Sequence, residues 1–389
     1  MGNTSETAGR LLDCVLRGGP WQRAWLAELI EQDSPSLFSM VAEGLSDRFE
    51  PRLVDVYNEI FAEAIAAVRP EHRPAELVER YRRVRLARRL EGEPRAVFVL
   101  SRVTLGAEVA VTSVILDAVK RRCPAARIVL VGPRKCWELF AADPRIEHLE
   151  VRYGGGLRDR IAASLPLSEP ESIVVDPDSR ITQLGLLPVC PEESYYLFES
   201  RTYGGDGSES LSALARRWAG ETFGVGDAHA NIAPAEIPDV TAGGIAVSFG
   251  VGGNAAKRVV DPFESGLLGA LMERGLPLIV DAGAGGEEAG RVERAVEASS
   301  ARVEVWRGSF AGFASIIARS QLYVGYDSAG QHVAAACGVP LVSIFAGFPS
   351  ARMFHRWRPT GTGATVIRVD RPEPAEILER VRAVIFAAG

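Results

Sequence analysis

Residues 321–345 constrain the fold more than any other stretch of this sequence. They read QLYVGYDSAGQHVAAACGVPLVSIF, with an apolar run at 321–325, helix-forming residues at 329–337 and a second apolar run at 341–345. Short apolar runs between turn signals are typical of buried strands, and the glycine and proline that follow residue 337 end the helix. The stretch therefore predicts a compact strand–helix–strand unit.

The loop that opens this helix predicts an anion-binding site. Asp327 and Ser328 stand at the N-cap position and are followed by Ala329 and Gly330. Free backbone N–H groups and the helix dipole favour a negatively charged group, such as a phosphate, at a helix N-terminus. The alternative is that Ser328 only caps the helix.

Strands and helices alternate over most of the chain. Apolar runs at 96–100, 127–131 and 172–176 are separated by amphipathic segments, and a second series of runs, at 245–249, 276–281 and 303–306, precedes the two at 321–325 and 341–345. This alternation predicts parallel β-α-β units, and therefore two doubly wound α/β domains. Ligands of such domains lie beyond the carboxyl ends of the strands, which is where Asp176 stands.

Residues 1–92 show a different pattern. Apolar positions recur every three or four residues, as in 53–68 and 77–90, and predict helices throughout. The last of these helices is basic, with six arginines: Arg80, Arg82, Arg83, Arg85, Arg88 and Arg89. Two interpretations stay open for it: a solvated face that packs on the next domain, or a peripheral contact with an anionic membrane surface.

Composition argues against several classes of protein. A formal net charge of −6 disfavours a nucleic-acid-binding protein. No apolar run approaches the roughly 18 residues of a membrane-spanning helix, and the N-terminus lacks the pattern of a signal peptide. The five cysteines are scattered without a Cys-x-x-Cys pair, and the histidines are dispersed. We therefore expect a reduced, cytoplasmic protein without a metal site.

The motif within 321–345 resembles the signature of glycosyltransferase family 9, the heptosyltransferase-like enzymes. That signature is Asp-(Ser/Thr)-(Gly/Ala)-x-x-His, a helix, Gly-x-Pro and an apolar strand. Asp327, Ser328, Ala329 and His332 match its first part, and the glycine and proline after the helix match the second. The resemblance covers roughly residues 96–369.

The resemblance implies a GT-B fold, which has two Rossmann-like domains facing across a cleft. The expected organisation is a helical extension at 1–92, an acceptor domain at 93–225, a linker at 226–243, a nucleotide-sugar domain at 244–372 and a C-terminal helix at 373–389.

The resemblance also implies a catalytic base. In the family an aspartate lies sixteen residues before the proline that ends the first long helix, and the same count from Pro124 reaches Glu108. This chain departs from the pattern because Glu replaces Asp and Ala107 separates it from Gly106. A buried carboxylate can still remove a proton from an acceptor hydroxyl. Asp176 is the second candidate, and a plain helix-terminal acid is the structural alternative for Glu108.

The donor site is implied in the same way. Lys257 and Arg258 match a Lys-Arg pair whose lysine contacts the donor phosphates, and Glu287 matches a glutamate that binds ribose hydroxyls. His332, one turn beyond Ser328, is expected near the donor phosphate. Residues 250–255 also fit the dinucleotide fingerprint G-x-G-x-x-A, so a dehydrogenase stays open, and Glu287 could be an ordinary first-turn acid.

The implied function is inverting, metal-independent transfer of a sugar, with a heptose favoured, from a nucleotide-diphosphate sugar to an acceptor hydroxyl. ADP-heptose is the donor that the family favours, and no other cofactor is expected. Two alternatives stay open: a sugar-nucleotide epimerase or hydrolase of the same fold, and a non-catalytic scaffold derived from a transferase. The acceptor, whether glycan, protein or small molecule, is not predicted.

Overall fold

The computed structural model describes residues 4–240, 242–252, 254–361, 363–371 and 373–387. Residue 253 of the glycine loop, residue 372 at the predicted domain end, and residues 1–3 and 388–389 of the predicted terminal segments lie outside the described residues.

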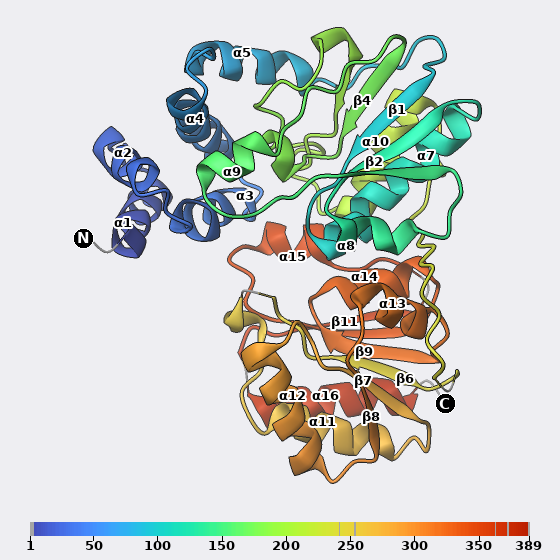
Figure 1. Cartoon of the computed structure of the whole chain (residues 1–389). Helices are drawn as coiled ribbons and strands as arrows, with labels where there is room; N and C mark the ends of the chain where they lie inside the picture. Colours follow the sequence, from blue (N-terminus) through green and yellow to red (C-terminus); the bar gives the residue numbers. More distant parts are fainter. Residues whose placement is uncertain (1–3, 241, 253, 362, 372, 388–389) are drawn as a thin grey trace. The chain divides into compact units, whose positions relative to one another are not determined.

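The chain divides into two compact units (Figure 1). The first comprises Met1–Thr104, Val114–Trp137 and Arg145–Ala228. The second comprises Leu105–Ser113, Glu138–Pro144 and His229–Gly389. The first unit thus contains the predicted helical extension and most of the predicted acceptor domain, whereas residues 105–113 and 138–144 of that predicted domain, Glu108 among them, fall in the second unit.

The first unit is built on a parallel sheet in the order β3-β2-β1-β4-β5. Its strands are β1 (Ala96–Leu100), β2 (Arg127–Gly132), β3 (Ile146–Glu150), β4 (Ser172–Asp176) and β5 (Tyr195–Leu197). Every residue of β1 and β4 is buried, as expected of parallel strands that are covered on both faces. The sequence predicted β1, β2 and β4, but it did not predict the edge strands β3 and β5.

Helices surround this sheet. The extension contributes α1 (Thr4–Leu16), α2 (Arg23–Glu31), the π-helix η1 (Leu37–Ala42), α3 (Glu43–Ser46), α4 (Pro51–Val68) and α5 (Pro74–Val84). The sheet connections contribute α7 (Ser113–Arg122), α8 (Arg134–Trp137), α9 (Leu157–Ala162), the 3-10 helices η4 (Arg180–Thr182) and η5 (Glu192–Ser194), and α10 (Leu211–Phe223).

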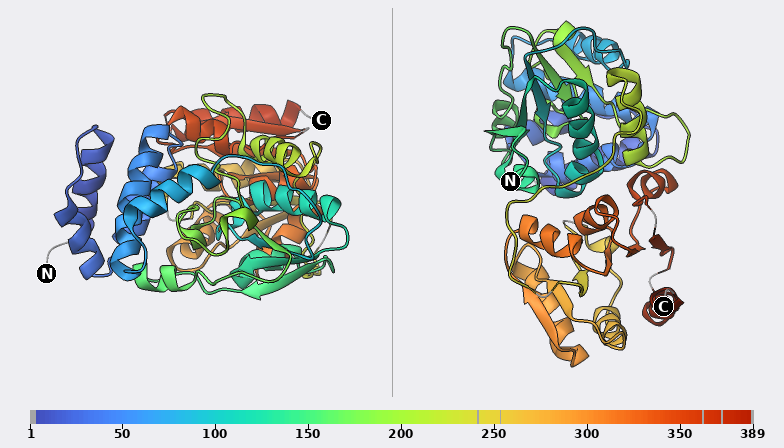
Figure 2. Two further views of the ribbon diagram at one scale, coloured as in Figure 1. Left: turned by 90° about the horizontal axis from the view of Figure 1, so that it is seen from above. Right: turned by 90° about the vertical axis from the view of Figure 1, so that its right-hand side faces the viewer.

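The helical extension shares one hydrophobic core with the sheet. Buried side chains of α4 and α5, among them Phe61 and Tyr81, belong to the same cluster as Phe98 of β1 and Val174 of β4. Figure 2 shows α4 and α5 between the outermost helices and the sheet. An amphipathic helix must bury its apolar face against another element, and here that element is the first domain itself.

The second unit is built on a six-stranded parallel sheet in the order β11-β10-β9-β6-β7-β8. Its strands are β6 (Ile245–Ser248), β7 (Leu278–Asp281), β8 (Val303–Trp306), β9 (Leu322–Tyr326), β10 (Leu341–Phe345) and β11 (Ala364–Arg368). Five of these were predicted, β8 and β10 at the observed bounds, and β11 was not. The two parallel sheets confirm the predicted α/β class.

The helices of the second unit are α11 (Phe263–Met272), α12 (Gly286–Ser299), α13 (Phe310–Ala318), α14 (Ala329–Ala336), α15 (Ala351–Trp357) and α16 (Pro374–Ala387). Short helical turns add η3 (Glu138–Phe140), η6 (Ala255–Lys257), α6 (Leu105–Ala107) and the π-helix η2 (Glu108–Thr112). None of the helices in the described parts of the chain is long and apolar enough to cross a membrane.

Candidate functional site

The candidate site lies where the strand order of the second sheet reverses direction. β6 and β9 are paired neighbours, with Ser248 opposite Gly325. The chain continues from β6 to β7 and β8 on one side, and from β9 to β10 and β11 on the other. The loops after β6 and β9 therefore diverge, and ligands of open α/β sheets bind in the crevice at such a point.

This topology brings Lys257 to the signature loop. Lys257 Nζ lies 2.7 Å from Asp327 Oδ2 and donates a hydrogen bond of 3.2 Å to the Asp327 carbonyl. Asp327 is 4% exposed and Lys257 is 18% exposed, so water screens this ion pair only in part. An ammonium has three N–H donors, and within the described residues Lys257 makes this one hydrogen bond and this one ion pair, which leaves at least one donor unused. The third is available to a ligand.

The opening turn of α14 adds hydrogen-bonding groups to the same place. Ser328 is extended, with φ −151°, and its side chain makes no capping hydrogen bond. Its Oγ is buried, and its side-chain neighbour is the Tyr323 hydroxyl. Because the first N–H groups of a helix also lack intrahelical partners, this turn presents donors without acceptors. The alternative role of Ser328 as a simple cap is not what the structure shows.

Tyr323 explains why this turn contains glycine. Its fully buried hydroxyl lies so close to Gly330 that a Cβ added there would collide with it. A Cβ added at Gly325 would lie 2.6 Å from the same oxygen. Burial raises the pKa of Tyr323, so the hydroxyl stays neutral. Gly330 is thus required by packing as well as by the predicted anion site.

Gln331 organises the signature from within. Its Nε2 donates to Asp327 Oδ1 and, at 3.3 Å, to the Trp357 carbonyl, while its Oε1 accepts from Ser343 at 2.5 Å. Gln331 is fully buried, so it binds the Asp327 carboxylate on the side that faces away from solvent. Sequence reasoning missed Gln331, because it occupies a variable position of the motif.

His332 is buried and neutral. Its Nε2 lies 3.3 Å from Gln331 Nε2, and its ring packs edge-to-face on Trp357. Burial lowers its pKa to about 4; Lys257 adds to that effect and Asp327 opposes it. A Cβ added at Gly106 would lie 3.3 Å from the His332 ring, so α6 packs directly on the start of α14.

Glu108 belongs to the second unit because of this packing. It opens the π-helix η2 directly after α6, and both elements contact α14. The side chain of Glu108 is fully buried.

Arg258 lies beside Lys257 but binds protein carboxylates. It donates to Asp261 and, at 3.2 Å, to Glu264 Oε1. Glu264 is 1% exposed and also binds Arg291 and Tyr326. This network ties the loop after β6 to α11 and α12.

The residue next to Glu287, the predicted ribose-binding acid, lies closer to the loops after β6 and β7. Glu287 is exposed at the first turn of α12. The next residue, Glu288, reaches back between the loops after β6 and β7, because a Cβ added at Gly250 would lie 2.8 Å from its Oε1. Burial raises the pKa of the neighbouring Asp281 to about 6, the Gly283 N–H opposes this shift, and Glu288 adds to it.

The glycine loop does not open a helix as a dinucleotide fingerprint would. In the described part of the chain, the first α-helix after Gly250 is α11, which begins at Phe263. The pyrophosphate of a dinucleotide binds at a helix N-terminus that follows the glycines directly. This arrangement disfavours the dehydrogenase alternative.

Asp176 lies in the first unit and is fully buried at the end of β4. Its carboxylate accepts hydrogen bonds of 2.5 Å each from the Ser179 N–H, the Thr182 hydroxyl and the Tyr195 hydroxyl. Burial raises its pKa to about 6, and these three donors oppose the shift. Asp176 therefore holds the loop after β4 in place.

The helix predicted at 77–90 is α5, which ends at Val84, so Arg85, Arg88 and Arg89 follow the helix; arginines of this segment make contacts inside the first unit. Arg83 binds Glu192, Arg85 binds Thr202 and Arg80 donates to the Gly185 carbonyl. Arg88 donates to three carbonyls around β5. Four of the six arginines thus contact the first domain, but Arg82, Arg83, Arg88 and Arg89 are exposed, and the membrane contact stays a prediction.

Comparison with known proteins finds a family model that matches part of the chain. Residues 265–382 match the sequence model of glycosyltransferase family 9 (heptosyltransferase). This segment is similar to family 9 sequences. It contains the whole signature, from Asp327 to His332, together with Glu287. The match confirms the predicted family resemblance and the predicted enzyme class, a glycosyltransferase.

Solved structures of family 9 enzymes share the fold. The ADP-heptose lipopolysaccharide heptosyltransferase II of E. coli is 17% identical, with a TM-score of 0.52 over 75% of this chain and 99% of that chain. E. coli heptosyltransferase WaaC, with ADP-2-deoxy-2-fluoro heptose, is 15% identical, with a TM-score of 0.58 over 76% and 100%. The family 9 glycosyltransferase of Veillonella parvula is 16% identical, with a TM-score of 0.54 over 76% and 91%. These likenesses confirm the predicted GT-B fold. No curated protein matches the chain by sequence.

Proposed function

We propose that this protein is an inverting glycosyltransferase that moves a sugar from a nucleotide-diphosphate sugar to an acceptor hydroxyl. One observation carries the proposal: the Lys257 ammonium, paired with Asp327, and the buried Ser328 Oγ, which makes no capping hydrogen bond, both lie at the opening of α14, at the switch point of the second sheet. A cation, a hydroxyl and free backbone N–H groups together suit a diphosphate.

The donor would lie with its diphosphate on Ser328, Ala329 and Gly330, within reach of Lys257. Support for ADP-heptose comes from the matched family, described as heptosyltransferase, and from E. coli structures named for ADP-heptose and an ADP-heptose analogue. We assign the ribose hydroxyls to the first turn of α12, where Glu288 is an alternative to the predicted Glu287. Arg258 would act by holding the Lys257 loop.

The reaction is a single displacement. Glu108 takes the proton of the acceptor hydroxyl, the oxygen attacks the anomeric carbon, and the bond from that carbon to the β-phosphate oxygen breaks. The nucleotide diphosphate leaves with one more negative charge, which Lys257 and the α14 dipole offset. Attack opposite to the leaving group inverts the anomeric configuration. Because protein groups supply the positive charge, we propose that the transfer is metal-independent.

The local helix geometry supports Glu108 as the base despite the departure from the family pattern. Ala107 is one residue more than that pattern has between glycine and acid. A π-helix closes each hydrogen bond over one more residue than an α-helix, so η2, which begins at Glu108, accommodates this insertion. Asp176 suits the role less well, because both of its carboxylate oxygens already accept hydrogen bonds.

The lysine content of the chain offers a direct test. The chain contains only Lys120, Lys135 and Lys257. Acetylation with acetic anhydride, followed by mass spectrometry, should show that ADP protects Lys257 while Lys120 and Lys135 react as before. Adenosine, which lacks phosphates, should protect none of them. Equal reactivity of Lys257 with and without ADP would overturn the proposal.

A second measurement separates the alternative functions. ADP-heptose is incubated with the protein alone, and the products are separated by chromatography. Rapid release of free heptose or conversion to an isomeric ADP-sugar without acceptor would indicate a hydrolase or an epimerase. Stable ADP-heptose together with Lys257 protection supports a transferase that waits for its acceptor.

A further inference from the structure

A buried tyrosine at the opening of α14 has a hydroxyl that packing alone does not explain. Tyr323 stands on β9, and its side chain lies on the same face as Gly325, because side chains alternate between the two faces of a sheet. Gly325 leaves room for the phenol to run along the strand toward its carboxyl end. A Cβ added at Gly325 would lie 2.6 Å from the Tyr323 hydroxyl, and a Cβ added at Gly330 would collide with it. The hydroxyl therefore lies between the end of β9 and the first turn of α14.

This placement of the hydroxyl lowers the stability of the fold. Glycine is among the least favourable residues in a helix, yet Gly330 is the second residue of α14, where Tyr323 leaves no room for a Cβ. A buried hydroxyl also costs free energy wherever it lacks a well-aligned hydrogen bond, and phenylalanine would avoid that cost. Local choices that oppose stability are expected mainly at functional sites.

Two serine hydroxyls lie beside the phenol. A Cβ added at Gly325 would lie 2.6 Å from the Ser248 carbonyl as well, so the end of β6 is next to Tyr323. Burial raises the pKa of Tyr323, and the hydroxyls of Ser328 and Ser248 oppose that rise. Within the part of the chain that the structure describes, neither Tyr323 Oη nor Ser328 Oγ has an aligned hydrogen bond. The protons of these two neighbouring hydroxyls are thus still available.

The three hydroxyls fit one order of donation. Ser248 Oγ accepts the Gly250 N–H at 3.3 Å, so its own proton can go to Tyr323. Tyr323, which is neutral, can then donate to Ser328 Oγ, and the Ser328 proton is left for a ligand. In such a chain each hydroxyl accepts one hydrogen bond and donates the next, which polarises the last donor and strengthens it.

We propose that Tyr323 is a positioning residue, whose hydroxyl turns the Ser328 hydroxyl so that the Ser328 proton is donated to a phosphate oxygen of the bound nucleotide diphosphate. The assignment rests on the proposed transferase function, which puts that diphosphate at the start of α14. A phosphate oxygen is negatively charged and only accepts, so it completes the chain that runs through Tyr323. The other pure acceptor at this turn, the Asp327 carboxylate, already binds Lys257 and Gln331.

Tyr81 of α5 supplies a matched control. It is also buried, but its hydroxyl accepts a hydrogen bond of 3.2 Å from Arg201, which is itself buried. Removal of that hydroxyl leaves a buried guanidinium N–H without its acceptor, which lowers stability. Removal of the Tyr323 hydroxyl breaks no aligned hydrogen bond, so stability should not fall. The two tyrosine-to-phenylalanine substitutions remove the same atom and are expected to have different effects.

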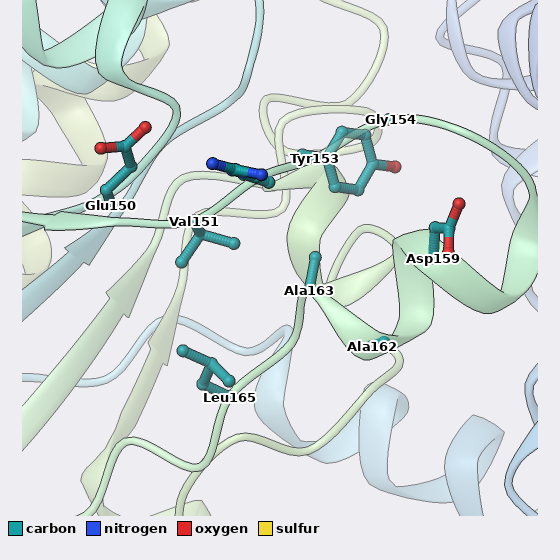
Figure 3. A pocket seen from close by; sticks show the side chains of 9 residues that line it. Glu150, Val151, Tyr153, Gly154, Asp159, Ala162, Ala163 and Leu165 are labelled. Carbon is teal, nitrogen blue, oxygen red and sulfur yellow. The ribbon is translucent and has the colours of Figure 1, made fainter.

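A nucleotide bound elsewhere would not depend on Tyr323. The first unit has a pocket at the end of β3, beside α9, and Figure 3 shows Glu150 and Asp159 at its opposite sides. These two carboxylates, against Arg152 alone, disfavour a diphosphate. Neither Tyr323 nor Ser328 lines that pocket, so variants at these positions also report where the nucleotide binds.

The test compares the parent protein, Tyr323→Phe, Ser328→Ala and the double variant. Each is titrated calorimetrically with ADP, UDP and GDP as probes and with adenosine as a control without phosphate. For the diphosphate that binds the parent most tightly, we expect Ser328→Ala to weaken binding about tenfold and Tyr323→Phe about fivefold, through loss or misalignment of one charge-assisted hydrogen bond. The double variant should bind no more weakly than Ser328→Ala, because Tyr323 acts through Ser328. Adenosine binding should not change.

Thermal unfolding of the same proteins separates positioning from packing. Tyr323→Phe should unfold at the temperature of the parent or above it, whereas Tyr81→Phe should unfold at a lower temperature and bind the diphosphate like the parent. Unchanged diphosphate affinity in Tyr323→Phe, additive losses in the double variant, or an equal loss of adenosine affinity would overturn the role of Tyr323 and leave the transferase proposal intact. A parent protein that binds none of the three diphosphates would overturn the transferase proposal, and this inference with it.

Discussion

Replacing Lys257 by alanine tests the candidate site more directly than any other change. The substitution removes the ammonium that lies 2.7 Å from Asp327 Oδ2. It also leaves a carboxylate that is 4% exposed with Gln331 as its remaining side-chain partner. A donor diphosphate would therefore lose an attraction and gain a repulsion from Asp327.

The size of the effect follows from the charges. Two unit charges about 4 Å apart interact by about 4 kcal/mol at an effective dielectric constant of about 20. Lys257 is 18% exposed, so screening reduces this interaction. We expect Lys257→Ala to weaken ADP binding by about 2–3 kcal/mol, which is roughly 30- to 150-fold in the dissociation constant. The folded state should lose about 1–2 kcal/mol through the broken ion pair.

The assay is calorimetric titration with ADP and with adenosine at one salt concentration. The loss should appear with ADP and not with adenosine, because adenosine carries no phosphate. The double variant Lys257→Ala/Asp327→Asn should recover part of the lost ADP affinity, because it removes the negative charge that Lys257 no longer neutralises. Unchanged ADP affinity in Lys257→Ala, or a further loss in the double variant, would refute this account of the site.

Three further predictions follow from the same geometry. Glu108→Gln should lower the rate of sugar transfer by about 10²- to 10⁴-fold in a turnover assay, while ADP affinity stays within about twofold. The reason is that a general base contributes to the chemical step and not to donor binding. Equal losses of transfer rate and ADP affinity would contradict its role as the base. His332 has a folded pKa of about 4, below its unfolded value, so its contribution to stability is present above about pH 6.5 and is lost as the pH falls toward 4. Its replacement by glutamine should flatten the urea-unfolding stability over that window by up to about 3 kcal/mol, and an unchanged slope would count against a buried neutral ring. Gly330→Ala should destabilise the protein by about 1–3 kcal/mol in thermal unfolding, because the added Cβ collides with Tyr323. The control is Gly269→Ala in α11, where no atom lies within 4 Å of the added Cβ; it should stabilise the protein by about 0.5–1 kcal/mol. Similar effects of both substitutions would show that the Tyr323 contact is not decisive.

The sequence by itself determined the elements that local pattern encodes. The apolar run at 341–345 is a fully buried strand, and burial on both faces leaves no polar positions to obscure the signal. The Asp-Ser-Ala-Gly turn was placed correctly at a helix N-terminus, because the residues that begin a helix are recognised from local sequence. The edge strands β3, β5 and β11 were missed, since they are short or partly exposed and their pattern is weak.

Only the tertiary structure decided which of these elements act together. The pair between Lys257 and Asp327 joins residues 70 positions apart, through the parallel pairing of β6 with β9, and no spacing rule encodes such a contact. Packing between distant segments likewise decides the role of Gln331, the orientation of Glu288 and the contact by which Asp33 of the helical extension fixes the start of α9. Periodicity reports which face of an element is buried, and only the assembled fold specifies what that face is buried against.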